Sequence, residues 1–216
     1  DSLLEIAYHK AGIIKDGVPL LTTATQSDVL ALFKETCQKH HSSFFHIAVE
    51  KQEHYPYTIR WKGKSYVLKQ PSYQVSNFTL ALHVVDKLID INEELVQETI
   101  DQFYWPCRFE KVGNLYLDGA HNRDGIEALL KTIKEQKLQD VGIVFSALSD
   151  KDIDDMLAML KEYDVVVASF DDDRSDHHHM DYKEAIELMK EKHQTVIVTG
   201  SLHFVSTVQK YVKSAL

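Results

Sequence analysis

Residues 108–212 alternate between strand-length apolar runs and segments with helical spacing, and this alternation constrains the fold more than any other feature. The strand-length runs are Val141–Leu148, Val165–Phe170 and Thr195–Val198. Segments with apolar residues at i, i+3, i+4 and i+7 are Ile126–Ile133, Ile153–Leu160 and Tyr182–Met189, and a last helix, with Ser201 as its expected N-cap, runs through Val205, Val208 and Val212. Strands that are apolar on both sides and alternate with helices are typical of an α/β domain with a mostly parallel sheet.

Ligands of such domains bind beyond the carboxyl ends of the strands, and polar turns are expected at those ends here. A short hairpin, Arg108–Val112 and Leu115–Asp118 with a Gly113-Asn114 turn, begins the domain. The polar turns that follow the strands are Asp118–Asn122, Ser149–Asp152, Asp171–Arg174 and Thr199–Ser201. Four polar loops on one edge of a sheet indicate a binding site, although loops exposed to solvent would have the same composition.

The turn DGAHN, residues 118–122, is the most informative of the four. A helix begins near Arg123, so its unpaired N–H groups and positive dipole end favour an anion such as a phosphate or carboxylate. Asp118 can accept hydrogen bonds from hydroxyl groups, and His121 can donate one to a phosphoryl oxygen. The alternative interpretation is that Asp118 and Asn122 only cap the helix.

The N-terminal part is less regular. Its expected helices are Ser2–Ile14, Asp28–Cys37, Ser76–Ile89 and Glu93–Phe103, and its expected strands are Val18–Thr23, Phe44–Val49, Tyr57–Trp61 and Ser65–Leu68. The sequence WPC, residues 105–107, ends the last helix because proline cannot continue one. The predicted domains are therefore residues 1–105 and 106–216.

Composition excludes several classes of protein. The 216 residues carry a formal net charge of −9, which argues against the basic face of a nucleic-acid-binding protein. No apolar run approaches the roughly 20 residues that span a bilayer. Two cysteines, Cys37 and Cys107, are too few for a disulfide framework and favour reduced thiols in the cytoplasm. Adjacent histidines in DHHH, 176–179, converge poorly on a metal ion, so an exposed loop is expected there.

Phosphate-binding glycine loops are missing from the sequence. GIEALLKT, residues 125–132, resembles a P-loop, but Leu130 occupies the place of the second glycine and the segment reads as a continuous helix. No other G-x-x-x-x-G-K-[ST] and no G-x-G-x-x-G is present.

Six stretches in order resemble the folylpolyglutamate and dihydrofolate synthases of the Mur ligase superfamily. EIAYHKAGIIKDGVPLLT (5–22) is similar to E-K-A-G-I-I-K-x-G-V-P, and YQVSNFTLAL (73–82) to H-Q-x-x-N-A-x-x-A-L. WPCRFE (105–110) resembles W-P-G-R-x-E, and LDGAHNRDG (117–125) resembles L-D-G-A-H-N-P. ALSDKD (147–152) and TGSLHFVSTV (199–208) resemble A-x-x-D-K-D and T-G-S-L-Y-x-V-S-x-V.

The resemblance implies a protein whose nucleotide lies between a P-loop ATPase domain and a Rossmann-like C-terminal α/β domain. Residues 1–105 would be the C-terminal portion of the central ATP-binding domain, and 106–216 the glutamate-binding domain. Because the chain starts with Asp1 and has no P-loop, we expect it to begin within a longer gene product and to be inactive alone.

The implied reaction is ATP-dependent amide formation. A folate γ-carboxylate takes the γ-phosphoryl group of ATP to give an acyl phosphate, and the amino group of L-glutamate then displaces phosphate. The expected cofactors are ATP and Mg²⁺, and the expected partners are small-molecule substrates, with no nucleic acid or membrane and a monomeric chain. Whether dihydropteroate is a second acceptor stays open from the sequence.

Family roles transfer to residues whose motifs match. Asn77 and Arg108 match nucleotide-binding positions, and Asp118 matches the residue that binds the ribose or orders domain closure. His121 matches the histidine near the reacting phosphate and incoming glutamate, so Asp118 and His121 are the expected catalytic pair. Both are also expected ATP contacts.

Three further residues match less central positions. Lys151 and Ser201 match the rim that receives the amino-acid carboxylate. Lys10 matches a lysine that family members carbamylate, and a carbamate would supply an anionic oxygen to Mg²⁺. An ordinary surface lysine is the alternative for Lys10 and Lys151.

The chain departs from the family motifs at four positions: His9 for Glu, Tyr73 for His, Cys107 for Gly and Arg123 for Pro. Arg123 would add positive charge near phosphate, a hypothesis that an unchanged ATP Michaelis constant in Arg123→Ala would refute. Cys107 would tighten a turn that glycine relaxes. Two other functions stay open, namely a Mur-type ligase of cell-wall precursors and a receiver-like regulatory module.

Overall fold

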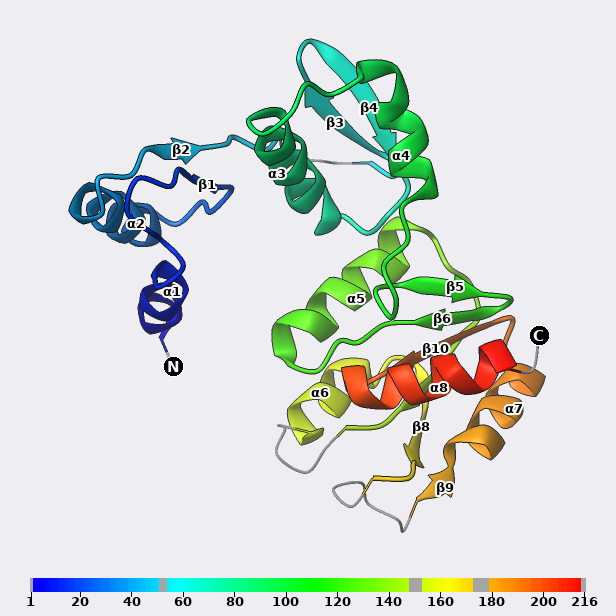
Figure 1. Ribbon diagram of the computed structural model, residues 1–216. Helices are drawn as coiled ribbons and strands as arrows, with labels where there is room; N and C mark the ends of the chain where they lie inside the picture. Colours follow the sequence, from blue (N-terminus) through cyan, green and yellow to red (C-terminus); the bar gives the residue numbers. More distant parts are fainter. Residues whose placement is uncertain (1, 51–53, 148–152, 173–178, 215–216) are drawn as a thin grey trace. The chain divides into compact units, whose positions relative to one another are not determined.

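The computed structural model describes residues 2–50, 54–147, 153–172 and 179–214 of the chain. The chain divides into two compact units, 1–102 and 103–216 (Figure 1). Each unit has hydrophobic cores of its own. Within the described residues, every helix is too short or too polar to cross a lipid bilayer.

The second unit has a six-stranded sheet with the order β5-β6-β10-β7-β8-β9. Its strands are β5 Glu110–Val112, β6 Leu115–Leu117, β7 Val141–Phe145, β8 Asp164–Ser169, β9 Met180–Asp181 and β10 Thr195–Thr199. Its helices are α5 Arg123–Glu135, α6 Ile153–Leu160, α7 Tyr182–Lys192 and α8 Leu202–Ser214. Only the β5–β6 pair is antiparallel, which confirms the predicted α/β class with a mostly parallel sheet.

Helices cover both faces of this sheet (Figure 1). On β10, Val196 and Val198 pack with α7 and α8, whereas Ile197 between them packs with α5 and α6. All five residues of β7 are buried, as expected for a central parallel strand covered on both faces. The apolar run that begins at Val141 leaves the sheet after Phe145, earlier than the predicted end at Leu148, which lies outside the described residues.

The first unit has two small sheets. Parallel strands β1 Leu20–Thr22 and β2 Phe44–His46 lie with α1 Leu3–Ala11 and α2 Ser27–Lys39. The hairpin of β3 Tyr57–Trp61 and β4 Lys64–Leu68 packs against α3 Gln74–Asp86 and α4 Val96–Gln102, and a 3₁₀ turn, Glu93–Leu95, precedes α4. Helix α1 ends before the predicted Ile14 because Gly12 closes it with hydrogen bonds to the last carbonyls.

Strands β6, β10, β7 and β8 run in the same direction, so their ends meet at two edges of the sheet. We call the edge with residues 118–122, 146–147, 170–172 and 199–201 the carboxyl edge. The opposite edge, with Asp140, Asp164 and His193, is the amino edge.

Candidate active site at the carboxyl edge

Asp118 begins the turn that follows β6. Its side chain is 5% exposed, and its Oδ1 accepts a hydrogen bond of 3.0 Å from the amide of Ala120. Asn122 caps α5 by accepting a hydrogen bond of 2.8 Å from the amide of Gly125. The capping interpretation therefore holds for Asn122, whereas Asp118 stabilises the turn itself.

His121 is half-buried, and its Nδ1 lies 3.0 Å from the carbonyl oxygen of Gly119. A carbonyl can only accept, so Nδ1 carries the hydrogen in this contact. In the neutral ring, Nε2 is then the acceptor, and in the protonated ring it is a second donor. One backbone contact thus fixes the orientation of the imidazole and the tautomer that it presents.

The loop after β10 lies beside this turn. The amide of Gly200 donates a hydrogen bond of 3.0 Å to the carbonyl of Ala120. Gly200 has φ +115°, and a Cβ there would lie 2.4 Å from the carbonyl oxygen of Ser146, so only glycine fits. Ser201, which is buried, accepts a hydrogen bond of 3.0 Å from the amide of Phe204 and caps α8, as its position predicted. Ser201 and Asp118 therefore border the same edge.

Arg108 reaches this edge through a tight turn. The carbonyl of Cys107 accepts a hydrogen bond of 2.8 Å from the amide of Gly119, which joins the turn to the Asp118 loop. Cys107 has φ +56°, the left-handed conformation that glycine adopts without strain, and burial raises the pKa of its thiol to about 11. The Arg108 side chain is half-buried, and its guanidinium makes no hydrogen bond or ion pair within the described residues. It is a cation available to an anionic ligand.

Glu110 is a residue of this region to which the sequence analysis gave no role. Its side chain is 3% exposed and accepts hydrogen bonds from Tyr104 Oη at 2.6 Å and from the amide of Cys107 at 2.9 Å. Lys213 Nζ lies 3.0 Å from the carboxylate, and Gln209 also donates to it. Burial acts to raise the pKa of Glu110, but these donors outweigh it and hold the pKa below its usual value.

The predicted residues of the first unit lie on two of its helices. Asn77 is exposed on α3, and its amide donates a hydrogen bond of 2.8 Å to Gln74. Lys10 is exposed in the last turn of α1. Lys151 lies outside the described residues, as does most of DHHH apart from His179. Arg123 is the exposed first residue of α5.

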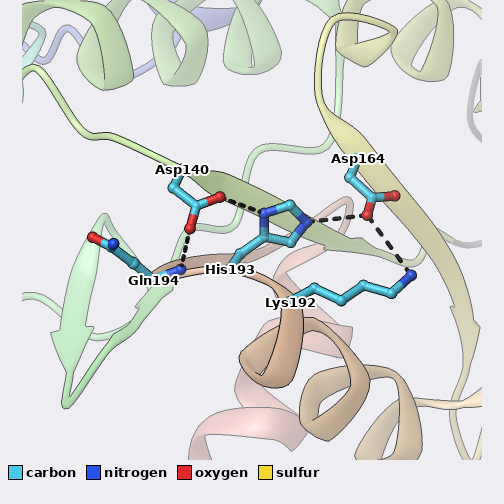
Figure 2. Close-up of polar contacts among 5 residues, drawn as sticks. All are labelled: Asp140, Asp164, Lys192, His193 and Gln194. Atoms are coloured by element: carbon cyan, nitrogen blue, oxygen red, sulfur yellow. Dashed lines mark hydrogen bonds and ion pairs between the residues drawn. The ribbon is translucent and has the colours of Figure 1, made fainter.

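The amino edge carries a second polar cluster that no motif indicated (Figure 2). His193 lies between two carboxylates, with Nδ1 2.8 Å from Asp140 and Nε2 3.0 Å from Asp164. The hydrogen bonds to Asp164 and Asp140 raise the pKa of His193. Asp140 also accepts a hydrogen bond of 2.9 Å from the amide of Gln194, and Lys192 Nζ lies 3.9 Å from Asp164.

Comparison with known proteins assigns the fold. A protein-family profile described as "Mur ligase, glutamate ligase domain" matches residues 107–216. The chain is 29% identical to the dihydrofolate synthase/folylpolyglutamate synthase of Bacillus subtilis over 99% of its own length and 59% of that protein. It thus spans well under two thirds of that relative.

Solved structures agree. The folylpolyglutamate synthase of Thermotoga maritima superposes with a TM-score of 0.83 at 23% identity, over all of this chain and 59% of that one. A complex of a folylpolyglutamate synthase with AMPPCP and folate superposes with a TM-score of 0.78 at 23% identity, over 98% of this chain and 57% of that one. The family profile covers half of the chain, and this half contains the parallel sheet and its carboxyl edge. The chain therefore belongs to the Mur ligase family.

Proposed function

We propose that this chain is part of an ATP-dependent ligase that adds L-glutamate to the γ-carboxyl group of a tetrahydrofolate. The observation that carries the proposal is the carboxyl edge itself. The oriented imidazole of His121 and the buried carboxylate of Asp118 lie in one turn, and the turn that carries Arg108 is hydrogen-bonded to it, in a domain that matches the glutamate ligase profile. The Bacillus subtilis relative carries both synthase names, so dihydropteroate is a second acceptor to assay.

In this proposal the two parts of the chain have different tasks. Residues 1–105 form the C-terminal portion of the central ATP-binding domain, and residues 106–216 bind glutamate. Arg108 and Asn77 bind the nucleotide, and Asp118 binds its ribose. Ser201 and Lys151 receive the carboxylate of the incoming amino acid.

The chemistry proceeds through an acyl phosphate. The folate γ-carboxylate attacks the γ-phosphorus of ATP and ADP leaves; the glutamate amine then attacks the acyl carbon, loses a proton, and phosphate leaves. His121 Nε2 faces the reacting groups in this proposal, where a protonated ring donates to a phosphoryl oxygen and a neutral ring accepts the amine proton. Positioning and charge stabilisation supply most of the rate enhancement in such transfers.

Magnesium would be held by few protein atoms. Within the described residues, no three His, Cys, Asp or Glu side chains gather as metal ligands. Mg²⁺ commonly keeps several waters and binds one or two carboxylates with substrate phosphates, so a carbamylated Lys10 fits this donor set. The ion would neutralise charge on the phosphates.

A chimera tests the function. Joined to the part of the Bacillus subtilis relative that has no counterpart here, these residues should incorporate labelled glutamate into tetrahydrofolate only when ATP is present. The 216 residues alone should show no turnover, because they contain no phosphate-binding loop. Incorporation into a nucleotide-sugar peptide instead, or turnover by the 216 residues alone, would contradict the proposal.

A further inference from the structure

A continuous path of hydrogen bonds joins the buried Glu110 carboxylate to the His121 ring. Glu110 accepts from the amide of Cys107 at 2.9 Å, and the Cys107 carbonyl accepts from the amide of Gly119 at 2.8 Å. The Gly119 carbonyl accepts from His121 Nδ1 at 3.0 Å. We propose that Glu110 is a positioning residue that sets the tautomer and orientation of His121 and the place of Arg108. Its catalytic meaning rests on the proposed function.

The turn that holds Arg108 needs such an anchor. Cys107 and Phe109, on either side of Arg108, have φ +56° and +52°, a region that is strained for residues with a side chain. Such a turn persists only when its surroundings hold it in place. Glu110 holds the N–H of Cys107 and Gly119 holds its carbonyl, so both peptide groups that flank Cys107 are fixed.

The anchor is itself fixed by the C-terminal helix. Gln209 and Lys213 of α8 donate to the two carboxylate oxygens, and Tyr104 donates to the oxygen that Lys213 contacts. Both oxygens of Glu110 therefore only accept. Along β5 and β6, Glu110 pairs with Leu117, the residue before Asp118, so the anchor lies beside the turn that it supports.

Glu110→Gln tests this role with little change in shape. One carboxylate oxygen becomes an NH₂ group, which turns donors toward either Cys107 or Lys213. At least one hydrogen bond is lost, and a buried donor is left unpaired. The change should loosen the Cys107 turn and, through Gly119, the contact that holds His121 Nδ1.

Asp140→Asn is the matched control. Asp140 also accepts from an amide, that of Gln194 at 2.9 Å, and from a second group, His193 at 2.8 Å (Figure 2). The chemical change is the same, but this cluster lies at the amino edge. Its hydrogen bonds join Asp140, Asp164, His193 and Gln194 and do not reach the His121 turn.

The readout is the ¹⁵N spectrum of the His121 ring in the 216-residue protein, which needs neither ATP nor turnover. The unchanged protein should show mainly the Nδ1–H tautomer of the neutral ring. Glu110→Gln should shift the tautomer ratio toward Nε2–H by about fivefold, the effect of one ordinary hydrogen bond, and Asp140→Asn should leave it unchanged. An unshifted ratio in folded Glu110→Gln, or an equal shift in both variants, would overturn the inference.

A milder variant decides the matter if Glu110→Gln does not fold. Gln209→Leu removes one donor and keeps the carboxylate, so it should shift the ratio in the same direction but less; no shift would count against the inference. If Glu110→Gln shifts the tautomer ratio of His121 but the chimera makes no glutamate amide, the proposed function is overturned. The coupling of Glu110 to His121 would still hold.

Discussion

The two edges of the parallel sheet each carry a carboxylate, a histidine and a lysine, arranged in opposite ways. At the amino edge the histidine is central, and both ring nitrogens of His193 face carboxylates. At the carboxyl edge the carboxylate is central, and every group around Glu110 is a donor. His121 lies at the end of that path, and its Nε2 makes no hydrogen bond within the described residues.

The difference shows how a polar cluster can be interpreted. The contacts of His193 join the starts of β7 and β8 to the segment before β10, so they hold strands together. The contacts of Glu110 lead to two joined turns: one carries Arg108, whose guanidinium has no hydrogen bond or ion pair within the described residues, and the other carries the oriented imidazole of His121. The two edges have similar residue types. They differ because the hydrogen-bond path from Glu110 ends at the Nε2 atom of His121, which can bind a ligand, whereas both ring nitrogens of His193 already contact carboxylates.

Replacing His121 and His193 by alanine, one at a time, should give the largest difference in effect between the two edges. In the chimera, His121→Ala should lower kcat by about 10²–10⁴-fold, the usual contribution of a general acid or base. His193→Ala should leave kcat within about twofold but lower the free energy of unfolding by about 0.5–2 kcal/mol, because two contacts with partly exposed carboxylates are lost. Steady-state kinetics and urea unfolding of both variants measure the two effects.

The opposite pattern would break the comparison. If His193→Ala removed activity in a protein that unfolds at the same urea concentration, the amino edge would be part of the site. If His121→Ala changed only stability, the carboxyl edge would be structural.

Local sequence patterns predicted much of this fold, but they did not predict many of the contacts at the carboxyl edge. The 3.6-residue spacing and the short apolar runs predicted α5 to α8, β7, β8 and β10, and residue type predicted the caps at Asn122 and Ser201. Glu110 meets Gln209, 99 residues away, and His193 meets Asp140, 53 residues away. Such contacts depend on which strands become neighbours, and no local periodicity records them.

Two glycines, one at each edge, offer a smaller test. A Cβ at Gly142 would lie 2.5 Å from Cδ2 of His193, whose ring is held on both sides; at Gly119 it would lie 2.7 Å from the tip of Leu202, which is 45% exposed and can turn away. Gly142→Ala should therefore cost about 1–3 kcal/mol of stability, and Gly119→Ala less.

The Gly142→Ala/His193→Ala double variant provides the control. Removal of the ring removes the two closest contacts of that Cβ and leaves only Met189 Cε at 3.1 Å, so the double variant should be more stable than the sum of the single effects, with a coupling of about 0.5–3 kcal/mol. Urea unfolding of the four proteins completes the cycle. Additive effects would mean that the His193 ring is not held where its two carboxylates place it.

The two edges should respond to pH in opposite directions, and this is the smallest effect expected. The pKa of His193 is raised on folding. Its contribution to the free energy of unfolding is therefore complete below the unfolded pKa of about 6.5 and is lost as pH rises through the folded pKa. The pKa of Glu110 is lowered, so its contribution is present above the unfolded value of about 4.5 and is lost as pH falls through the folded value.

Comparison with neutral variants isolates each contribution. The stability gap between the unchanged protein and His193→Gln should narrow from pH 6 to pH 9, because the imidazolium between Asp140 and Asp164 loses its charge while nearby Lys192 keeps its own. The difference in the free energy of unfolding between the unchanged protein and Glu110→Gln should stay constant over that range. It should become smaller only below about pH 4.5. If the stability difference between the unchanged protein and His193→Gln does not change with pH, the ring makes these contacts as a neutral group. The contrast between a charged His193 at the amino edge and a charged Glu110 at the carboxyl edge would then fail.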